Sequence, residues 1–257
     1  MIKYIILILF IIISIFVFMN PIIIRIPFEK FENLDDIISD MYVITLGKKE
    51  RIQNIKEQER KINDRITRFK AVNGLKLDIN ELIKNNILDK NYNLCGPKNS
   101  NHSKREIGCY LSHLNIYKKI KKDNKKGYTI IFEDDFLVNS PNLKDDVRKS
   151  IDKLNRKNID FDYLYLGSTR INYGENIIDN LHYVNPKQNL FGTHAYVINN
   201  KNIDKIIDNV KIIKRPIDVI IHDIGKNHIF NIVIMYPYTV TQNKSFKSTV
   251  NNKSTVI

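Results

Sequence analysis

The sequence predicts an α/β fold with a mostly parallel central sheet, preceded by an N-terminal transmembrane helix. Two observations carry this prediction. Apolar strand-like runs alternate with amphipathic helical stretches over residues 41–235, a pattern typical of a parallel sheet covered by helices. A long uncharged apolar run precedes them. With 257 residues, of which 43% are hydrophobic, the chain is large enough to bury one core of ordinary size.

Residues 1–26 are expected to form a membrane anchor. No charged residue occurs between Tyr4 and Ile24. At about 1.5 Å per residue in a helix, this run spans roughly 30 Å, the thickness of the hydrocarbon core of a bilayer. The alternative is a cleaved signal peptide, which would have a shorter apolar region and small residues before the cleavage site. The flanking positive charges are few and nearly balanced, so they do not determine the orientation of the anchor.

The remaining chain divides into a connector at 27–40, a folded domain at 41–250 and a polar tail at 251–257. The expected strands of the domain are 41–46, 67–71, 128–132, 163–166, 193–198 and 229–235. The expected helices are 50–62, 143–155, 203–210 and 217–226, with one more that starts at Ser103 and ends before Lys125-Lys126-Gly127.

The helix that starts at Ser103 has the clearest local signals. Ser103-x-x-Glu106 fits a capping box, in which each side chain accepts a hydrogen bond from a backbone N–H at the helix start. Apolar residues then recur at helical spacing and predict the buried side of the helix: Ile107, Tyr110, Leu111, Leu114 and Tyr117.

The chain is strongly basic, with 41 Lys and Arg residues against 28 acidic ones and a formal net charge of +13. Such an excess favours anionic partners, although scattered lysines also arise from skewed residue usage. One class of protein therefore left open is a membrane-tethered basic protein that binds nucleic acid or acidic lipid without catalysing a reaction. That class would gather Lys and Arg with aromatic residues on one face, and the sequence shows no such motif.

Three consecutive carboxylates, Glu133-Asp134-Asp135, follow the apolar strand at 128–132 directly. This position is the carboxyl edge of the sheet, where open α/β folds bind nucleotides. Dense oxygen ligands suit Mn²⁺ or Mg²⁺, which take their remaining ligands from water and substrate phosphates. The alternative interpretation is a solvated turn, because acidic residues are common after strands.

Six segments, in order along residues 41–248, resemble glycosyltransferase family 25, the lipooligosaccharide and procollagen galactosyltransferases. They are Tyr42-Val-Ile-Thr-Leu46 with Arg51, Phe69-Lys-Ala-Val-Asn-Gly74, Glu106-Ile-Gly-Cys-Tyr-Leu-Ser-His113, Phe132-Glu-Asp-Asp135, Gly192-Thr-His-Ala-Tyr196 and Pro216-Ile-Asp218. The third segment is the most specific of them. Arg105 departs from the family, which commonly has Gly before this Glu.

The resemblance implies a GT-A-like, Rossmann-type domain that binds a nucleotide sugar. It further implies a UDP-sugar donor, with galactose as the expected sugar, a Mn²⁺ or Mg²⁺ ion, and inversion at the anomeric carbon. The acceptor would be a hydroxyl of a glycan, a protein or a lipid-linked saccharide, and no nucleic acid is expected as a partner. Asp135 is expected to bind the metal directly, with Glu133 and Asp134 holding metal-bound water or the donor ribose.

Further site residues rest on the same matched segments. Donor-side candidates are Arg51, Gly74, Ser112 and His113. Arg51 could neutralise a phosphate or lie solvated at the surface, and His113 could line the donor pocket or be a buried structural histidine.

Asp218 is the candidate general base, with Asp223 as its competitor. Pro216 at a helix start places Asp218 in the first turn, and His222 follows four residues later on the same face. Asp218 could instead merely stabilise the positive end of that helix. A metal-dependent phosphohydrolase or nuclease also stays open, because Asp218, His222 and Asp223 could supply the extra ligands of a two-metal site.

The compartment of the domain is not decided by its residues. Cys95 and Cys109 suit either a disulfide in an oxidising compartment or two free thiols. Given the anchor and the resemblance, we expect a single-pass type II membrane protein with its catalytic domain in the lumen of the secretory pathway.

Overall fold

The computed structural model describes residues 37–170 and 172–246, which belong to the unit Leu34–Ile257. The predicted anchor, most of the predicted connector and the predicted polar tail lie outside these residues. Within the described ranges, no helix is both long enough and apolar enough to cross a membrane.

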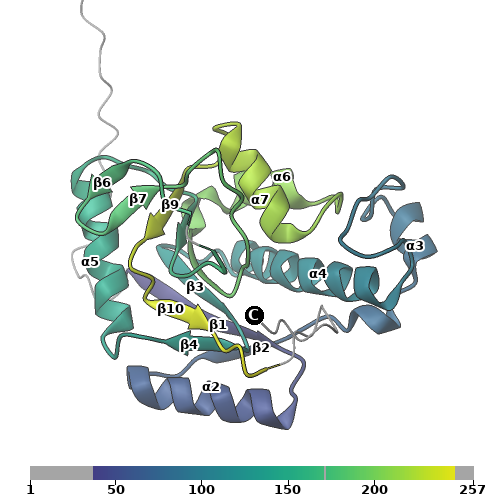
Figure 1. Ribbon diagram of the computed structural model, residues 1–257, viewed down its shortest axis with the longest axis horizontal. Coiled ribbons are helices and arrows are strands. Elements are labelled where there is room, and N and C mark those ends of the chain that lie inside the picture. The colour runs from purple at the N-terminus through teal and green to yellow at the C-terminus, as the bar shows by residue number, and fades with distance from the viewer. Residues whose placement is uncertain (1–36, 171, 247–257) are drawn as a thin grey trace, which may run out of the picture. The chain divides into compact units, whose positions relative to one another are not determined.

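The centre of the fold is an eight-stranded sheet with the strand order β2-β1-β3-β8-β5-β9-β7-β6 (Figure 1). The strands are β1 (Ile38–Thr45), β2 (Thr67–Lys70), β3 (Tyr128–Glu133), β5 (Tyr163–Tyr165), β6 (Asn176–Ile178), β7 (Leu181–Tyr183), β8 (Ala195–Asn199) and β9 (Ile232–Met235). β1 pairs in parallel with β2 and β3, and β5 pairs in parallel with β9, whereas β8 and β7 are antiparallel to both of their neighbours. Six strands therefore run one way and two run the other, which confirms a mostly parallel sheet in terms of strand direction.

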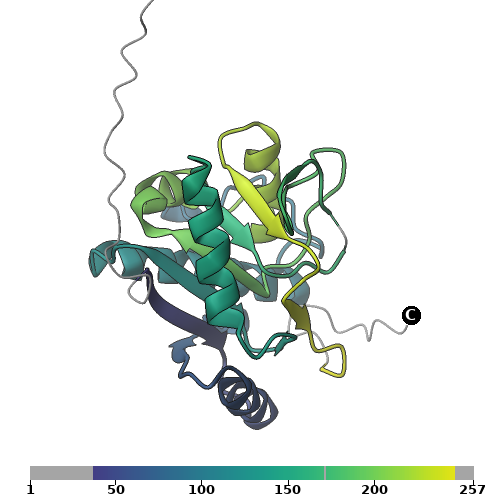
Figure 2. The ribbon, with the colours of Figure 1, turned by 90° about the vertical axis from the view of Figure 1, so that its left-hand side faces the viewer.

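Helices cover both faces of this sheet. They are α2 (Lys49–Ile62), α3 (Ile79–Lys84), α4 (Asn101–Lys122), α5 (Leu143–Arg156), α6 (Ile203–Val210) and α7 (Ile217–Lys226), with short 3₁₀ turns η2 (Gly74–Lys76) and η3 (Asn200–Asn202). α4, α6 and α7 share one apolar core with the sheet. Figure 2 shows α5 lying across the opposite face. A small antiparallel pair, β4 (Phe136–Val138) and β10 (Val240–Gln242), extends from the end of β3.

The alternation of side chains along the strands explains why these strands are apolar throughout. Tyr42 and Ile131 point to the face that packs against α4, where the predicted stripe from Ile107 to Tyr117 is buried as expected. Val43 and Ile130 point to the other face and are fully buried as well. A sheet covered on both sides requires apolar residues at both parities, as the continuous runs in the sequence indicated.

Three strand starts differ from the prediction. β1 begins at Ile38, so residues 38–40 of the predicted connector belong to the sheet. The strands expected at 193–198 and 229–235 begin only at Ala195 and Ile232. In each case the apolar run located the centre of the strand, and pairing with its neighbours determined where it starts.

The predicted capping box is wrong. α4 begins at Asn101, and its N-cap is Ser100, whose hydroxyl accepts a hydrogen bond from the Ser103 backbone N–H at 3.1 Å. Ser103 lies inside the first turn, where its own hydroxyl donates to the Ser100 carbonyl. Glu106 is buried and accepts from the backbone N–H of Cys95 at 2.9 Å. Glu106 therefore holds the preceding loop against the helix instead of capping it.

Candidate active site

The acidic triplet lies where β1, β3 and β8 meet at one edge of the sheet. Glu133 is the last residue of β3, and its backbone N–H bonds to the carbonyl of His194, just before β8. Thr45 is the last residue of the parallel neighbour β1. The triplet therefore lies at the carboxyl edge of the sheet, as predicted, where the carboxyl ends of parallel strands bring together residues far apart in sequence.

Asp134 is held by two elements. Its Oδ2 accepts a hydrogen bond from the Thr45 hydroxyl at 2.7 Å, and its Oδ1 lies 3.2 Å from Nη1 of Arg51 in the first turn of α2. Burial raises the pKa of Asp134 to about 6, and the nearby carboxylates of Asp135 and Glu133 add to the shift. Asp134 is thus part of a crowded cluster of carboxylates, and the guanidinium of Arg51 stabilises its negative charge.

Asp135 faces the same arginine. Its Oδ2 lies 3.0 Å from Nη1 of Arg51 and accepts from Nε2 of Gln242 at 3.1 Å. Its Oδ1 is buried and has no hydrogen-bond partner among the described residues. Burial, followed by the charge of Glu133, raises the pKa of Asp135. A buried carboxylate oxygen without a partner is costly, and a metal ion would remove that cost.

Asn54 of α2 fixes the backbone of the turn that carries these carboxylates. Its side-chain amide donates to the carbonyls of Asp134 at 3.1 Å and of Phe136 at 3.0 Å. Arg51, one helical turn earlier, is 2% exposed and stacks over the Phe246 ring at 4.4 Å. α2 therefore positions both the turn and its charge partner. Arg51 lies beside the acidic triplet, and its guanidinium contacts carboxylates.

Glu133 points toward α4 and the loop before β8. Its Oε1 accepts from the Thr193 hydroxyl at 2.6 Å and lies 3.4 Å from Nε2 of His113. Burial opposes ionisation of Glu133, but these contacts outweigh burial and lower its pKa. Nδ1 of His113 lies 2.7 Å from the hydroxyl of Tyr196, which fixes the imidazole ring. His113 is therefore a buried member of the site.

The two candidate bases differ sharply in environment. Asp218 lies in the first turn of α7, as predicted, and is half-buried; burial raises its pKa, and the charge of Glu133 adds to the shift. Asp223 forms an ion pair with Arg215, and its side chain is 40% exposed. Asp218 therefore lies within the electrostatic influence of Glu133, whereas Asp223 is paired with Arg215.

The carboxylate of Asp218 also has a structural task. Oδ1 accepts from the Val219 backbone N–H and Oδ2 from that of Gly192, both at 2.9 Å. The second bond connects α7 to the loop that carries Thr193. The neighbouring histidines are buried: burial lowers the pKa of His194 and of His222.

Two predicted donor-side residues are structural contacts between α4 and the segment before it. A side chain at Gly74 would come 1.8 Å from the carbonyl oxygen of Lys104, so only glycine permits this approach. The hydroxyl of Ser112 accepts from the Val72 backbone N–H at 2.9 Å and donates to the Gly108 carbonyl at 2.6 Å. These contacts place α4 against the sheet, and they leave the Ser112 hydroxyl engaged with the backbone.

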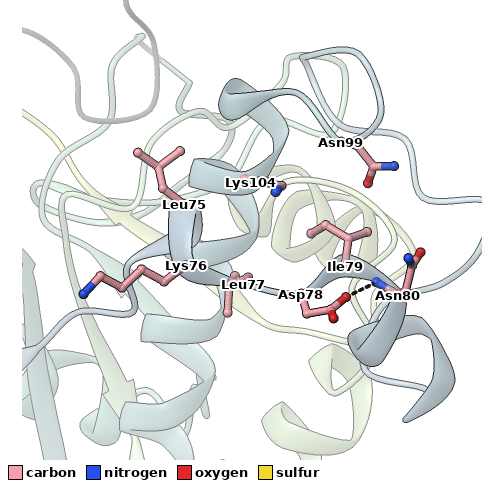
Figure 3. A pocket seen from close by; sticks show the side chains of 8 residues that line it. All are labelled: Leu75, Lys76, Leu77, Asp78, Ile79, Asn80, Asn99 and Lys104. Carbon is pink, nitrogen blue, oxygen red and sulfur yellow. Dashed lines mark hydrogen bonds between the residues drawn. The ribbon is translucent and has the colours of Figure 1, made fainter.

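A surface cavity of about 420 Å³ lies beside η2 and the first turns of α4 (Figure 3). Its lining residues are Leu75, Lys76, Leu77, Asp78, Ile79, Asn80, Asn99 and Lys104. Asp78 caps α3 by accepting from the backbone N–H of Asn80 at 2.9 Å. None of the predicted site residues lines this cavity. The candidate site is therefore defined by the contacts of the acidic triplet, and not by this cavity.

Sequence reasoning missed Thr45, Thr193 and Gln242 as partners of the carboxylates. Thr45 could have been found, because it ends a strand that runs parallel to the strand carrying the triplet. Thr193 lies in a segment that had been matched to the family. Gln242 offers no signal in the sequence, since only the pairing of β10 with β4 brings it to Asp135.

Comparison with known proteins agrees with this geometry. The sequence profile of glycosyltransferase family 25 (LPS biosynthesis protein) matches residues 38–221, from the start of β1 into α7. The match includes the acidic triplet, its arginine and Asp218. No curated protein matches the chain. Because the profile covers well over half of the sequence, the chain belongs to glycosyltransferase family 25.

Proposed function

We propose that this glycosyltransferase is a metal-dependent, inverting enzyme that moves a hexose from a UDP-sugar to a hydroxyl of a glycan, protein or lipid-linked saccharide. The observation that carries the proposal is Asp135 at the edge of the sheet, with one buried oxygen that has no partner among the described residues. Galactose as the sugar rests on the resemblance of the matched segments to galactosyltransferases.

The carboxylates of Asp135 and Glu133 would hold a Mn²⁺ or Mg²⁺ ion, which supplies positive charge against the diphosphate of the leaving nucleotide. Asp134 is tied to Thr45 and Arg51 and keeps the turn in place. Arg51 adds a fixed positive charge beside the carboxylates, which lowers the repulsion among them.

Asp218 is the proposed base. It takes the proton of the acceptor hydroxyl as that oxygen bonds to the anomeric carbon on the face opposite the nucleotide. The bond from this carbon to the phosphate oxygen breaks, and its electrons leave with UDP, so the configuration inverts. The raised pKa of the half-buried Asp218 suits proton uptake better than that of a solvated aspartate.

A two-metal phosphohydrolase or nuclease is less well supported. Such a site needs further acidic residues or histidines around the triplet. Of the residues expected to supply them, Asp223 is paired with Arg215 on the exposed side of α7, and both oxygens of Asp218 already accept backbone N–H groups. Membership of a glycosyltransferase family also disfavours a basic binding protein without activity.

A donor screen tests the proposed function. We expect the purified full-length protein to hydrolyse or transfer sugar from UDP-galactose or another UDP-hexose when Mn²⁺ is present, with products resolved by mass. CMP- and GDP-sugars provide the matched control. Turnover of a phosphodiester in place of every UDP-sugar would assign the site to the phosphohydrolase class instead.

The membrane anchor requires its own test, because residues 1–26 lie outside the described part of the chain. We propose that they tether a type II protein. Deletion of residues 1–26 should move the protein from the membrane fraction to the soluble fraction with donor turnover retained, since the proposed site residues all follow residue 41. Recovery of the truncated, folded protein in the membrane fraction would contradict this proposal.

A further inference from the structure

Cys109, His113 and Glu133 come together beside the triplet. One ligand atom from each lies within 4.8 Å of the other two, and no other group of three such residues in the described ranges is this close. Cys109 and His113 are four residues apart on α4, so their side chains lie on one face of the helix. Glu133 approaches them from the end of β3.

These three ligand types differ from those at Asp135. Thiolate, imidazole and carboxylate together are the ligands of zinc sites, with bond lengths of about 2.0–2.3 Å and a tetrahedral arrangement. Asp135 offers oxygen alone, which suits Mn²⁺ or Mg²⁺. We propose that Cys109, His113 and Glu133 form a second cation site, selective for a borderline-soft divalent ion such as Zn²⁺.

The surroundings of His113 support this site. Nδ1 of its ring lies 2.7 Å from the Tyr196 hydroxyl, which itself lies 2.8 Å from that of Tyr117. Metal-binding histidines commonly have their second nitrogen engaged in this way, which leaves the first with its lone pair toward the ion. Nε2 is the nitrogen that faces Glu133.

Charge around the thiol also favours a cation. The carboxylates of Glu133, Asp218, Asp135 and Glu106 lie close enough to act electrostatically on the Cys109 sulfur. The same negative charges attract a divalent ion, which displaces the thiol proton to solvent when the sulfur binds. Zn²⁺ is better suited to this displacement than Mn²⁺, because it binds thiolate and imidazole more strongly.

The two sites share Glu133. An ion held by Cys109 and His113 would bind the Glu133 carboxylate and make it unavailable to an ion at Asp135. The two ions would therefore compete for Glu133. This consequence rests on the proposed function, whereas the existence of the second site does not. Its test therefore uses metal binding alone.

Cobalt is the probe, because a thiolate bound to Co²⁺ gives a charge-transfer band in the near ultraviolet. The chain has two cysteines, which makes Cys95→Ser a matched control for Cys109→Ser. We expect the band in the full-length wild type and in Cys95→Ser, with one ion bound per chain, and its loss in Cys109→Ser. Equimolar Zn²⁺ should remove the band, and equimolar Mn²⁺ should not.

A conservative substitution of Tyr196, the residue that contacts His113, gives a second measurement. Tyr196→Phe removes the hydroxyl at Nδ1 of His113 and should weaken Co²⁺ binding about 10–100-fold, with the band position retained. Absence of the band from the wild type, or its loss in Cys95→Ser with persistence in Cys109→Ser, would overturn the proposal. Failure of the donor screen would leave both measurements interpretable, since neither depends on turnover.

Discussion

Asp135→Ala should abolish sugar transfer, lowering turnover by a factor of at least about 10²–10³, the usual cost of removing one stabilising group for transition-state charge. The substitution removes both carboxylate oxygens: the buried Oδ1, which has no partner among the described residues, and Oδ2, which contacts Arg51 and Gln242. Steady-state kinetics with a UDP-sugar and saturating Mn²⁺ measures the effect, and chelation of the metal should reduce wild-type turnover to a similar level.

Two controls separate this loss from unfolding. Asp135→Asn keeps the size of the side chain and should be equally inactive, while circular dichroism and thermal melting report on its fold. Asp145→Ala removes a carboxylate of α5 whose side chain is 59% exposed and pairs with Arg148, so it should retain wild-type turnover. Full wild-type activity in excess EDTA would show that the carboxylates of the triplet serve no metal.

The strands and helices that position the triplet could be predicted because each has a strong local pattern. β3 is a continuous apolar run that ends in three acids, and α4 repeats buried residues from Ile107 onward. The missed elements are the six-residue helix α3 and four strands of three residues each, β4, β6, β7 and β10. β5 is as short, but the apolar run at 163–166 predicted it. A three-residue strand has too few positions to show a period, and it exists only through its partner.

The contacts within the site were less predictable, because they depend on distances between segments. Ser112 and Gly74 matched the family, yet both contact the backbone that fits α4 to the preceding segment. A motif match locates the residues of a site. It does not distinguish residues that would contact a ligand from residues that only hold the ligand-binding residues in place. Arg51 shows the same limit, since its basic charge suggested phosphate, whereas in the structure it neutralises Asp134 and Asp135.

Asp218→Asn should lower turnover by about 10²–10⁴-fold, the range for loss of general-base catalysis. Because burial raises the pKa of Asp218, wild-type activity should fall as the pH drops through that raised value, where the base becomes protonated. The acid limb of the pH–rate profile is therefore expected above the range of a solvated aspartate, near 3.9. Loss of this limb from the residual activity of Asp218→Asn would link it to the carboxylate.

Asp218→Asn removes the proposed base and also changes hydrogen bonds that hold the structure. Both oxygens of Asp218 accept backbone N–H groups, so an amide satisfies only one of them and loosens either α7 or the Gly192 loop. Thr193→Val provides the matched control, because it breaks the contact of that loop with Glu133 and leaves Asp218 intact. If Asp218 only positions the loop, both variants should weaken UDP binding together with turnover.

If Asp218 is the base, Asp218→Asn should lose turnover while its affinity for UDP stays nearly unchanged. Thr193→Val should not show this combination. Asp223→Asn should be close to wild type, because its carboxylate is paired with Arg215 on the exposed side of α7. An inactive Asp223→Asn beside an Asp218→Asn that loses less than about tenfold would assign the base to Asp223. Since Asp218 lies within the electrostatic influence of Glu133 and Asp223 is paired with Arg215, the larger loss is expected at Asp218.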